Sequence, residues 1–142
     1  MTIRARPCRE CPYRKESPSG LWSAEDYLKL PPYDRETGSQ PPVPFICHTS
    51  PEAMCHGWAV VGMSRGHAFE LLALRLAVAF GEDAEIPERV VDLFDSGTAA
   101  AEHGLRDIRR PGKKARAAME RMQRLIERRA ESLDDKSSDA LA

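Results

Sequence analysis

Four cysteines are the residues of this chain best suited to chemistry. Cys8 and Cys11 form a C-x2-C pair near the start, and Cys47 and Cys55 follow in a C-x7-C arrangement. A C-x2-C turn lets two thiolates converge on one ion or on one face of a cluster. Cysteines that merely filled a core would also occur in the apolar segments after residue 56, which contain none. The pattern predicts one metal or cluster site with all four cysteines as ligands.

The spacing favours an iron–sulfur cluster, with zinc as the alternative. Structural zinc sites typically use two tight knuckles, and the C-x7-C half is wider than a knuckle. The Cys11-Pro12 dipeptide and the uneven spacing suit a [4Fe-4S] cluster, in which each iron takes one thiolate. A redox dithiol would need a strand before the pair and a helix after it in an α/β pattern, which is absent. A disulfide framework is disfavoured in the reducing cytoplasm, where we expect this protein.

Five further side chains are expected around the sulfur atoms. His48 and His56 each directly follow a cysteine. Imidazole can bind zinc and some iron–sulfur centres, but with four thiolates available we expect the histidines to be outer hydrogen-bonding partners or exposed. Aromatic rings would limit the exposure of a cluster to solvent and oxidants. The expected outer residues are Tyr13, Trp22, His48, His56 and Trp58.

The pattern of apolar residues and helix caps predicts a mostly α-helical fold. Ser23 resembles an N-cap, and the helix after it should reach about Leu30, before two prolines. A helix from Pro51 to about Met63 should contain Cys55. The 67–80 segment is apolar on most faces and should be a buried helix. No strand is expected, and further helices are expected over 87–95, 98–103 and 113–133.

Three segments are predicted. Residues 1–103 form a small, metal- or cluster-organised helical domain with irregular N-terminal loops. Residues 104–133 form a basic loop followed by a long amphipathic helix with a narrow apolar stripe. Residues 134–142 have the composition of a disordered tail. The net charge is only −1, but its distribution is uneven: seven acids lie between 82 and 102, and ten bases lie between 104 and 129.

The basic segment is a candidate nucleic-acid contact. Arginines and lysines around a Pro-Gly turn can contact phosphates along a duplex. The alternatives are that the helix packs on its own domain, docks on the acidic 82–102 segment, or forms a homodimer through residues 113–133. The candidate nucleic-acid residues are Arg109, Arg110, Lys113, Lys114 and Arg116.

The cysteine segments also carry a family resemblance. The sequence resembles a family of small, uncharacterised four-cysteine proteins of actinobacteria and their phages, over roughly residues 7–80. The resemblance implies that the four cysteines are ligands, and it implies no activity. A looser similarity links the chain to the WhiB-type iron–sulfur regulators, although here the tight cysteine pair comes first. The matching motifs are Pro7-Cys8-x-x-Cys11-Pro12-Tyr13-Arg14, Phe45-x-Cys47-His48 and Cys55-x-Gly57-Trp58.

These observations predict a small iron–sulfur protein that is regulatory or associated with nucleic acid and transcription. The alternative is a structural zinc module that binds a host protein and has no redox role. DNA, or a transcription or host protein, is the expected partner. No apolar stretch approaches the ~18 residues of a membrane span, so no membrane role is expected. An enzyme is disfavoured because four thiolates leave no vacant metal position, and the sequence contains neither a glycine-rich phosphate loop nor a nucleophile elbow.

Overall fold

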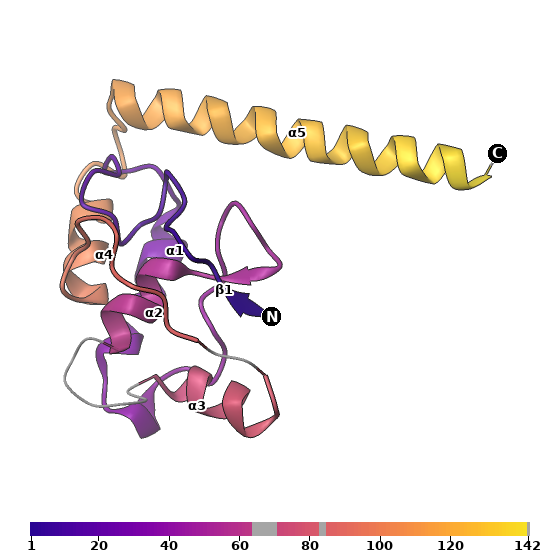
Figure 1. Ribbon diagram of the computed structural model, residues 1–142. Helices are drawn as coiled ribbons and strands as arrows, with labels where there is room; N and C mark the ends of the chain where they lie inside the picture. The colour runs from indigo at the N-terminus through magenta and orange to yellow at the C-terminus, as the bar shows by residue number, and fades with distance from the viewer. Residues whose placement is uncertain (64–70, 83–84, 142) are drawn as a thin grey trace.

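The computed structural model describes residues 1–63, 71–82 and 85–141. These residues form a mostly helical fold, as predicted, and contain five α-helices (Figure 1). The elements in chain order are β1 (Thr2–Ile3), α1 (Ala24–Leu28), the 3-10 helices η1 (Pro31–Asp34) and η2 (Thr37–Ser39), β2 (Ala53–Met54), α2 (His56–Met63), α3 (Leu72–Ala79), α4 (Gly97–Leu105) and α5 (Lys113–Leu141).

Helix α2 lies at the centre of the body. Its residues from His56 to Gly62 are all buried, because a helix that is apolar on every side must be covered on every side. Trp58 on α2 belongs to the main core with Tyr13, Leu30 and Leu93. This core brings the N-terminal loops, α1, α2 and the 91–94 segment together.

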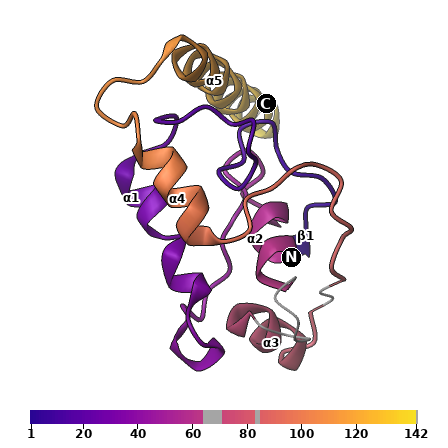
Figure 2. The same cartoon turned by 90° about the vertical axis from the view of Figure 1, so that its left-hand side faces the viewer.

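Helices α1 and α4 lie side by side at one side of the body (Figure 2). The predicted Ser23 cap is present, since its hydroxyl accepts a hydrogen bond from the Asp26 backbone N–H. Helix α4 is capped by Ser96, two residues earlier than the predicted cap at Thr98. Asp34 adds a second cap, because its carboxylate accepts hydrogen bonds from the Gly97 and Thr98 backbone N–H groups at 2.8 and 2.7 Å.

The prediction of a helix over 87–95 is wrong. This segment is irregular and pairs with the first cysteine loop: the Phe94 N–H donates to the Tyr13 carbonyl at 2.8 Å, and the Lys15 N–H donates to the Asp92 carbonyl at 3.2 Å. Leu93 is fully buried, whereas Val90 is 44% exposed. Backbone N–H and C=O groups of the first cysteine loop require hydrogen-bond partners. Residues 92 and 94 supply them, and the segment therefore does not form a helix of its own.

Two further expectations are wrong: that no strand forms, and that Cys55 lies inside a helix. Strands β1 and β2 pair in parallel, with Thr2 opposite Ala53 and Ile3 opposite Met54. Cys55 directly precedes α2 rather than lying one turn inside it. The segment with the predicted Pro51 helix start is used instead to turn the chain toward β2.

Helix α3 covers part of the predicted 67–80 helix, whose first residues lie outside the described residues. The prediction that this helix is buried on most sides fails for the described part, residues 71–80, in which only Leu71, Ala73 and Leu74 are buried. Phe80 at its end is 85% exposed. The apolar sequence of α3 is therefore only partly covered by the body.

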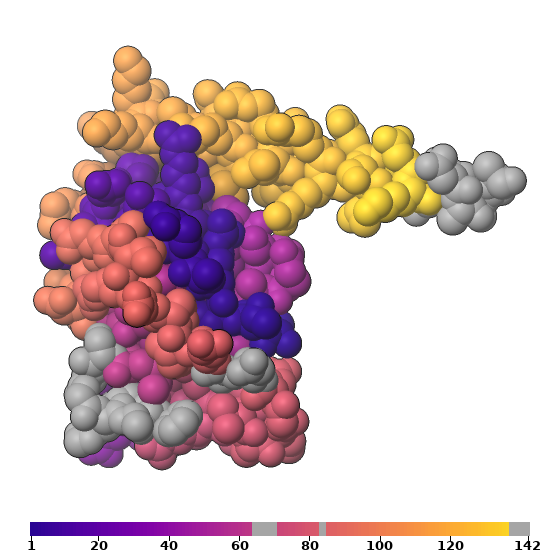
Figure 3. All heavy atoms as spheres, in the orientation of Figure 1, coloured from indigo at the N-terminus to yellow at the C-terminus, as the bar shows by residue number. Residues whose placement is uncertain are grey.

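Helix α5 begins at the predicted Lys113 and crosses above the body (Figure 1). Ala115, Ala118 and Met122 are its buried apolar residues, whereas Ile126 and Leu133 are 58% and 66% exposed. The helix continues to Leu141, through residues for which a disordered tail was expected, and its second half projects past the body (Figure 3). No helix among the described residues is both long enough and apolar enough to cross a membrane.

Candidate metal centre

The first cysteine pair lies in a chain of tight turns. The Cys11 N–H donates to the Cys8 carbonyl at 3.1 Å, and the Arg14 N–H donates to the Cys11 carbonyl at 3.0 Å. The Ser17 hydroxyl also donates to the Cys11 carbonyl, at 2.6 Å. These bonds hold the backbone between the two cysteines in a turn, so that their side chains can converge.

The second pair is brought together by a hairpin-like pairing of residues 45–47 with 53–55. The Cys47 N–H donates to the Ala53 carbonyl at 2.9 Å, and the Cys55 N–H donates to the Phe45 carbonyl at 2.8 Å. An isolated antiparallel bridge joins Ile46 to Met54 between them. Backbone hydrogen bonds therefore bring Cys47 and Cys55 together across the wide C-x7-C interval. The spacing of the cysteines in the sequence did not predict this pairing.

The four thiols are buried and adjoin one another. Each cysteine is at most 4% exposed, and none forms a disulfide. The Cys11 and Cys55 sulfur atoms are 3.7 Å apart, and Cys8 interacts with both Cys11 and Cys47. The contacts thus form a chain in the order Cys47, Cys8, Cys11, Cys55. Among residues 1–63, 71–82 and 85–141, however, no group of three or more His, Cys, Asp or Glu side chains is arranged so that it could hold a metal ion.

Mutual contact raises the pKa of three of the thiols, Cys8, Cys11 and Cys47. The hydrogen bond with Cys11, reinforced by burial, raises the pKa of Cys8 to about 11. The hydrogen bond with Cys8 and burial raise the pKa of Cys47 to about 12, and contact with Cys55 raises the pKa of Cys11 well above its ordinary value. Two adjacent thiolates in a buried site repel each other and lack hydration. The protonated form of Cys8, Cys11 and Cys47 is therefore favoured near pH 7 unless a cation compensates the lost protons.

Arg4 is a partner of the cluster that the sequence analysis did not identify. Its Nη1 donates to the Cys47 sulfur at 3.6 Å, to the Thr49 hydroxyl at 3.1 Å and to the Ser50 hydroxyl at 2.8 Å. The backbone N–H of Arg4 donates to the Met54 carbonyl at 3.0 Å. A cation is thus fixed beside one thiol, and only the pairing of the N-terminus with the 45–55 segment places it there.

The two predicted outer histidines lie in different surroundings. The ring of His48 stacks on Trp22, with 4.1 Å between centroids, and its Nε2 lies 3.7 Å from Asp26 Oδ2. The buried His56 ring has its Nδ1 3.0 Å from the Arg4 carbonyl. Burial is the main cause that lowers the pKa of both histidines, so the neutral form is favoured. His56 therefore contacts the backbone of Arg4, the residue whose side chain reaches Cys47.

The predicted aromatic residues form walls close to the thiols. Tyr13 is fully buried and meets Phe45 edge to face at 6.5 Å between ring centroids. Gly57 lets the start of α2 pack closely on Tyr13 and Cys11. A Cβ at residue 57 would lie 2.5 Å from Tyr13 Cβ and 3.0 Å from the Cys11 sulfur. Trp58 meets the Tyr33 ring at 5.5 Å. The Trp22 indole N–H donates to the Glu10 carbonyl at 2.8 Å and thereby holds the cysteine turn.

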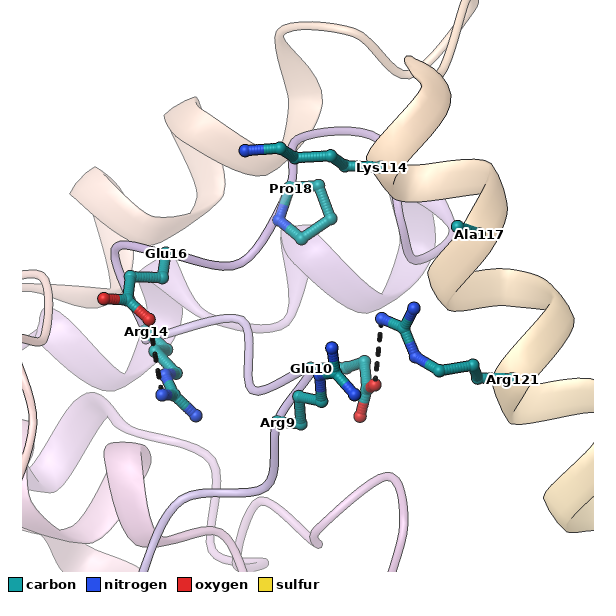
Figure 4. A pocket seen from close by; sticks show the side chains of 8 residues that line it. All are labelled: Arg9, Glu10, Arg14, Glu16, Pro18, Lys114, Ala117 and Arg121. Carbon is teal, nitrogen blue, oxygen red and sulfur yellow. Dashed lines mark hydrogen bonds and ion pairs between the residues drawn. The ribbon is translucent and has the colours of Figure 1, made fainter.

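The candidate nucleic-acid residues do not all share one surface hollow. Arg109 and Arg110 lie in the loop before α5 and line a hollow with Arg106. Lys113 and Arg116 are exposed on the first turn of α5. Lys114 lines a different hollow, which Figure 4 shows between α5 and the first cysteine loop.

The comparisons with known proteins identify a family but no activity. The sequence profile described as a family of unknown function (DUF6283) matches residues 3–129 of the chain. No curated protein and no solved structure matches the chain.

The raised pKa values predict slow alkylation of the metal-free protein. The thiolate is the reactive form, so at pH 8.5 Cys8 should react with iodoacetamide at least roughly a hundredfold more slowly than in the unfolded chain, whose thiol pKa is about 8.5. Raising the pH toward 11 should speed this reaction as the thiolate forms. Peptide mass spectrometry resolves the individual rates, and the chain in guanidinium is the control. Equal rates at Cys8 in the folded and unfolded chains would contradict the prediction.

Proposed function

The chain belongs to the DUF6283 family of unknown function, and we propose that it is a small metal-thiolate protein whose four cysteines hold an interaction module together. The observation that carries this proposal is the chain of contacts among Cys47, Cys8, Cys11 and Cys55. A metal at these residues would tie the first cysteine turn to the 45–55 hairpin. Structural metal sites contribute directly to folding in domains with little regular structure.

The sulfur spacing favours zinc over an iron–sulfur cluster. A tetrahedral site with Zn–S bonds of about 2.3 Å has edges of about 3.8 Å, and the Cys11 and Cys55 sulfurs are 3.7 Å apart. A [4Fe-4S] cluster binds each thiolate to a separate iron, so its ligands lie further apart. The hairpin also removes the objection that C-x7-C is too wide for zinc. The [4Fe-4S] cluster that the spacing predicted is the alternative that metal analysis distinguishes.

The residues fit a structural centre better than a catalytic one. Four thiolates complete a tetrahedral zinc site and leave no position for a substrate. Arg4 supplies the outer hydrogen bond to Cys47 that such sites use to orient and stabilise a thiolate. Zinc bound to these cysteines would replace their protons with a cation and so compensate the negative charge of the thiolates.

A second candidate function is association with nucleic acid, as in a transcriptional or host regulator. The supporting observation is that Arg109, Arg110, Lys113, Lys114 and Arg116 are exposed at the start of α5 and in the loop before it. Exposed cations bind phosphates by releasing condensed counterions, and this binding weakens as salt rises. This role is compatible with a zinc centre or an iron–sulfur centre in the same chain.

Metal analysis tests the primary proposal. Anaerobically purified protein should be colourless and contain one zinc per chain, and Cys11→Ser should lose most of the metal and much of the thermal stability, because it removes one of the four thiolates. Elemental analysis, a visible spectrum and thermal unfolding measure these quantities. His48→Gln is the control, because the His48 ring packs on Trp22. A brown sample with iron and sulfide would replace zinc by the cluster, and a metal-free folded protein would contradict both.

The outer role of Arg4 has its own test. Arg4→Ala should lower zinc affinity by roughly tenfold to a hundredfold, because outer-shell hydrogen bonds orient and stabilise metal ligands. A chromophoric chelator in competition measures the affinity. Arg6→Ala removes the same charge at an exposed position and should leave the affinity nearly unchanged. Equal losses in the two variants would show that Arg4 acts only through net charge.

The nucleic-acid candidate predicts salt-dependent binding to a DNA duplex. The variant Lys113→Gln/Lys114→Gln should reduce the slope of log affinity against log salt by about 1 to 2, because two phosphate contacts are lost. The variant Lys29→Gln/Arg35→Gln removes two charges near α1 and should leave the slope unchanged. Electrophoretic shifts at several salt concentrations measure the slope. Absence of salt-dependent binding would eliminate this candidate.

A further inference from the structure

Two adjoining hollows follow the inner side of α5 where it crosses the first cysteine loop. Their volumes are about 350 and 410 Å³, and they share Arg9, Glu10 and Arg121. We name the two hollows together the α5 trough. Figure 4 shows the first hollow, with Lys114 and Arg121 on α5 facing the loop that carries Arg9 and Glu10.

The α5 trough is strongly basic. Apart from the Arg14–Glu16 ion pair at 3.4 Å, Glu10 is the only acid among the described residues that line the trough, and it lies 3.7 Å from Arg121. One carboxylate therefore faces a much larger positive charge, and the excess requires an anionic occupant or solvent. The six cations that line the trough besides Arg14 are Arg4, Arg9, Lys114, Arg121, Arg124 and Arg128.

Several of these cations are free to bind a ligand. The guanidinium groups of Arg9 and Arg124 have no hydrogen-bond or ion-pair partner in the part of the chain that the structure describes. Arg128 donates only to the Arg124 carbonyl, at 3.5 Å, within the same described part. Arg4 is the trough cation that hydrogen-bonds a thiol, so neutralisation of the cysteine centre does not explain the others. The free guanidinium groups lie on both walls.

The spacing of the cations along α5 suits a linear polyanion. Lys114, Arg121 and Arg128 are separated by seven residues each and therefore lie on one face of the helix. At 1.5 Å per residue this row is about 21 Å long, which corresponds to about six nucleotides of a strand at 3.4 Å each. Guanidinium groups match phosphate oxygens in a bidentate manner, and arginine outnumbers lysine in the trough.

The lining also indicates what is not recognised. No aromatic side chain lines either hollow among the described residues, so bases have no ring on which to stack. The contacts available are therefore to the phosphate backbone, which carries no base sequence information directly.

We propose that the α5 trough binds the phosphodiester backbone of nucleic acid without base-sequence preference. This inference deepens the proposed nucleic-acid association and places its centre at Arg9, Arg124 and Arg128 rather than at the loop before α5. It does not depend on which metal the cysteines bind. The first cysteine loop forms one wall, so the metal centre supports the trough but takes no part in the contacts.

Fluorescence anisotropy with labelled DNA of about 20 nucleotides tests the trough, at salt from roughly 50 to 200 mM, where phosphate contacts dominate the salt dependence. Single strands and duplexes of two unrelated sequences distinguish the two forms of backbone. The variant Arg124→Gln/Arg128→Gln should bind at least tenfold more weakly, with a salt slope smaller by about 1.4 to 1.8. The matched control is Lys29→Gln/Arg35→Gln, which removes the same charge at exposed positions outside the trough and should stay within about twofold of the natural protein.

A second variant, Arg9→Gln, tests the opposite wall without altering α5, and should also weaken binding. Circular dichroism and metal content should be unchanged in all variants. Equal losses in the trough and control variants, or a loss confined to the control, would overturn the assignment while leaving nucleic-acid association standing. Equally tight binding of polyglutamate would overturn it in favour of an acidic protein partner. No salt-dependent DNA binding would overturn both the trough and the nucleic-acid candidate, whereas the metal proposal would be judged separately by metal content.

Discussion

The convergence of four buried thiols is the constraint on which the rest of the structure depends. Cys8 and Cys11 come from a series of tight turns, and Cys47 and Cys55 come from the two sides of a hairpin-like pairing. These segments contain little regular helix or sheet, so their positions depend on tertiary contacts. The 3.7 Å approach of the Cys11 and Cys55 sulfurs joins the two halves at the start of α2. A centre at this junction would determine how both loops meet the core.

The cysteine turn also determines the position of α5. Glu10, between the first two cysteines, is 6% exposed and lies 3.7 Å from Arg121 on the helix. At the other loop, the Arg129 guanidinium donates to the Thr49 carbonyl beside Cys47. Helix α5 therefore contacts both cysteine segments. Its other cations, Arg124 and Arg128, line the hollow between these two contacts. A loss of order at the thiols would alter the α5 trough even though the arginines do not bind the metal.

Local signals predicted the elements whose causes are local. The Ser23 cap and the Lys113 start of α5 depend on residues within one or two turns, and the structure has both. The 87–95 segment shows the opposite case: its apolar pattern suggested a helix, but pairing with the turns around Tyr13 keeps it irregular. The same holds for Cys55, whose pairing with Phe45 excludes the predicted helix start at Pro51. Long-range backbone pairing outweighed local propensity at both places.

By itself, the sequence determined which residues a metal centre would draw on, because the number, spacing and position of four cysteines are local facts of the chain. It also indicated a long basic helix, since charge and a narrow apolar stripe are readable without a fold. Only the tertiary structure decided that the wide cysteine pair is closed by a hairpin, that Arg4 reaches Cys47, and that the arginines of α5 face Arg9 across a trough. Each of these three features depends on contacts between segments that are far apart in the chain. The residue spacing within one segment does not determine its distance from another segment.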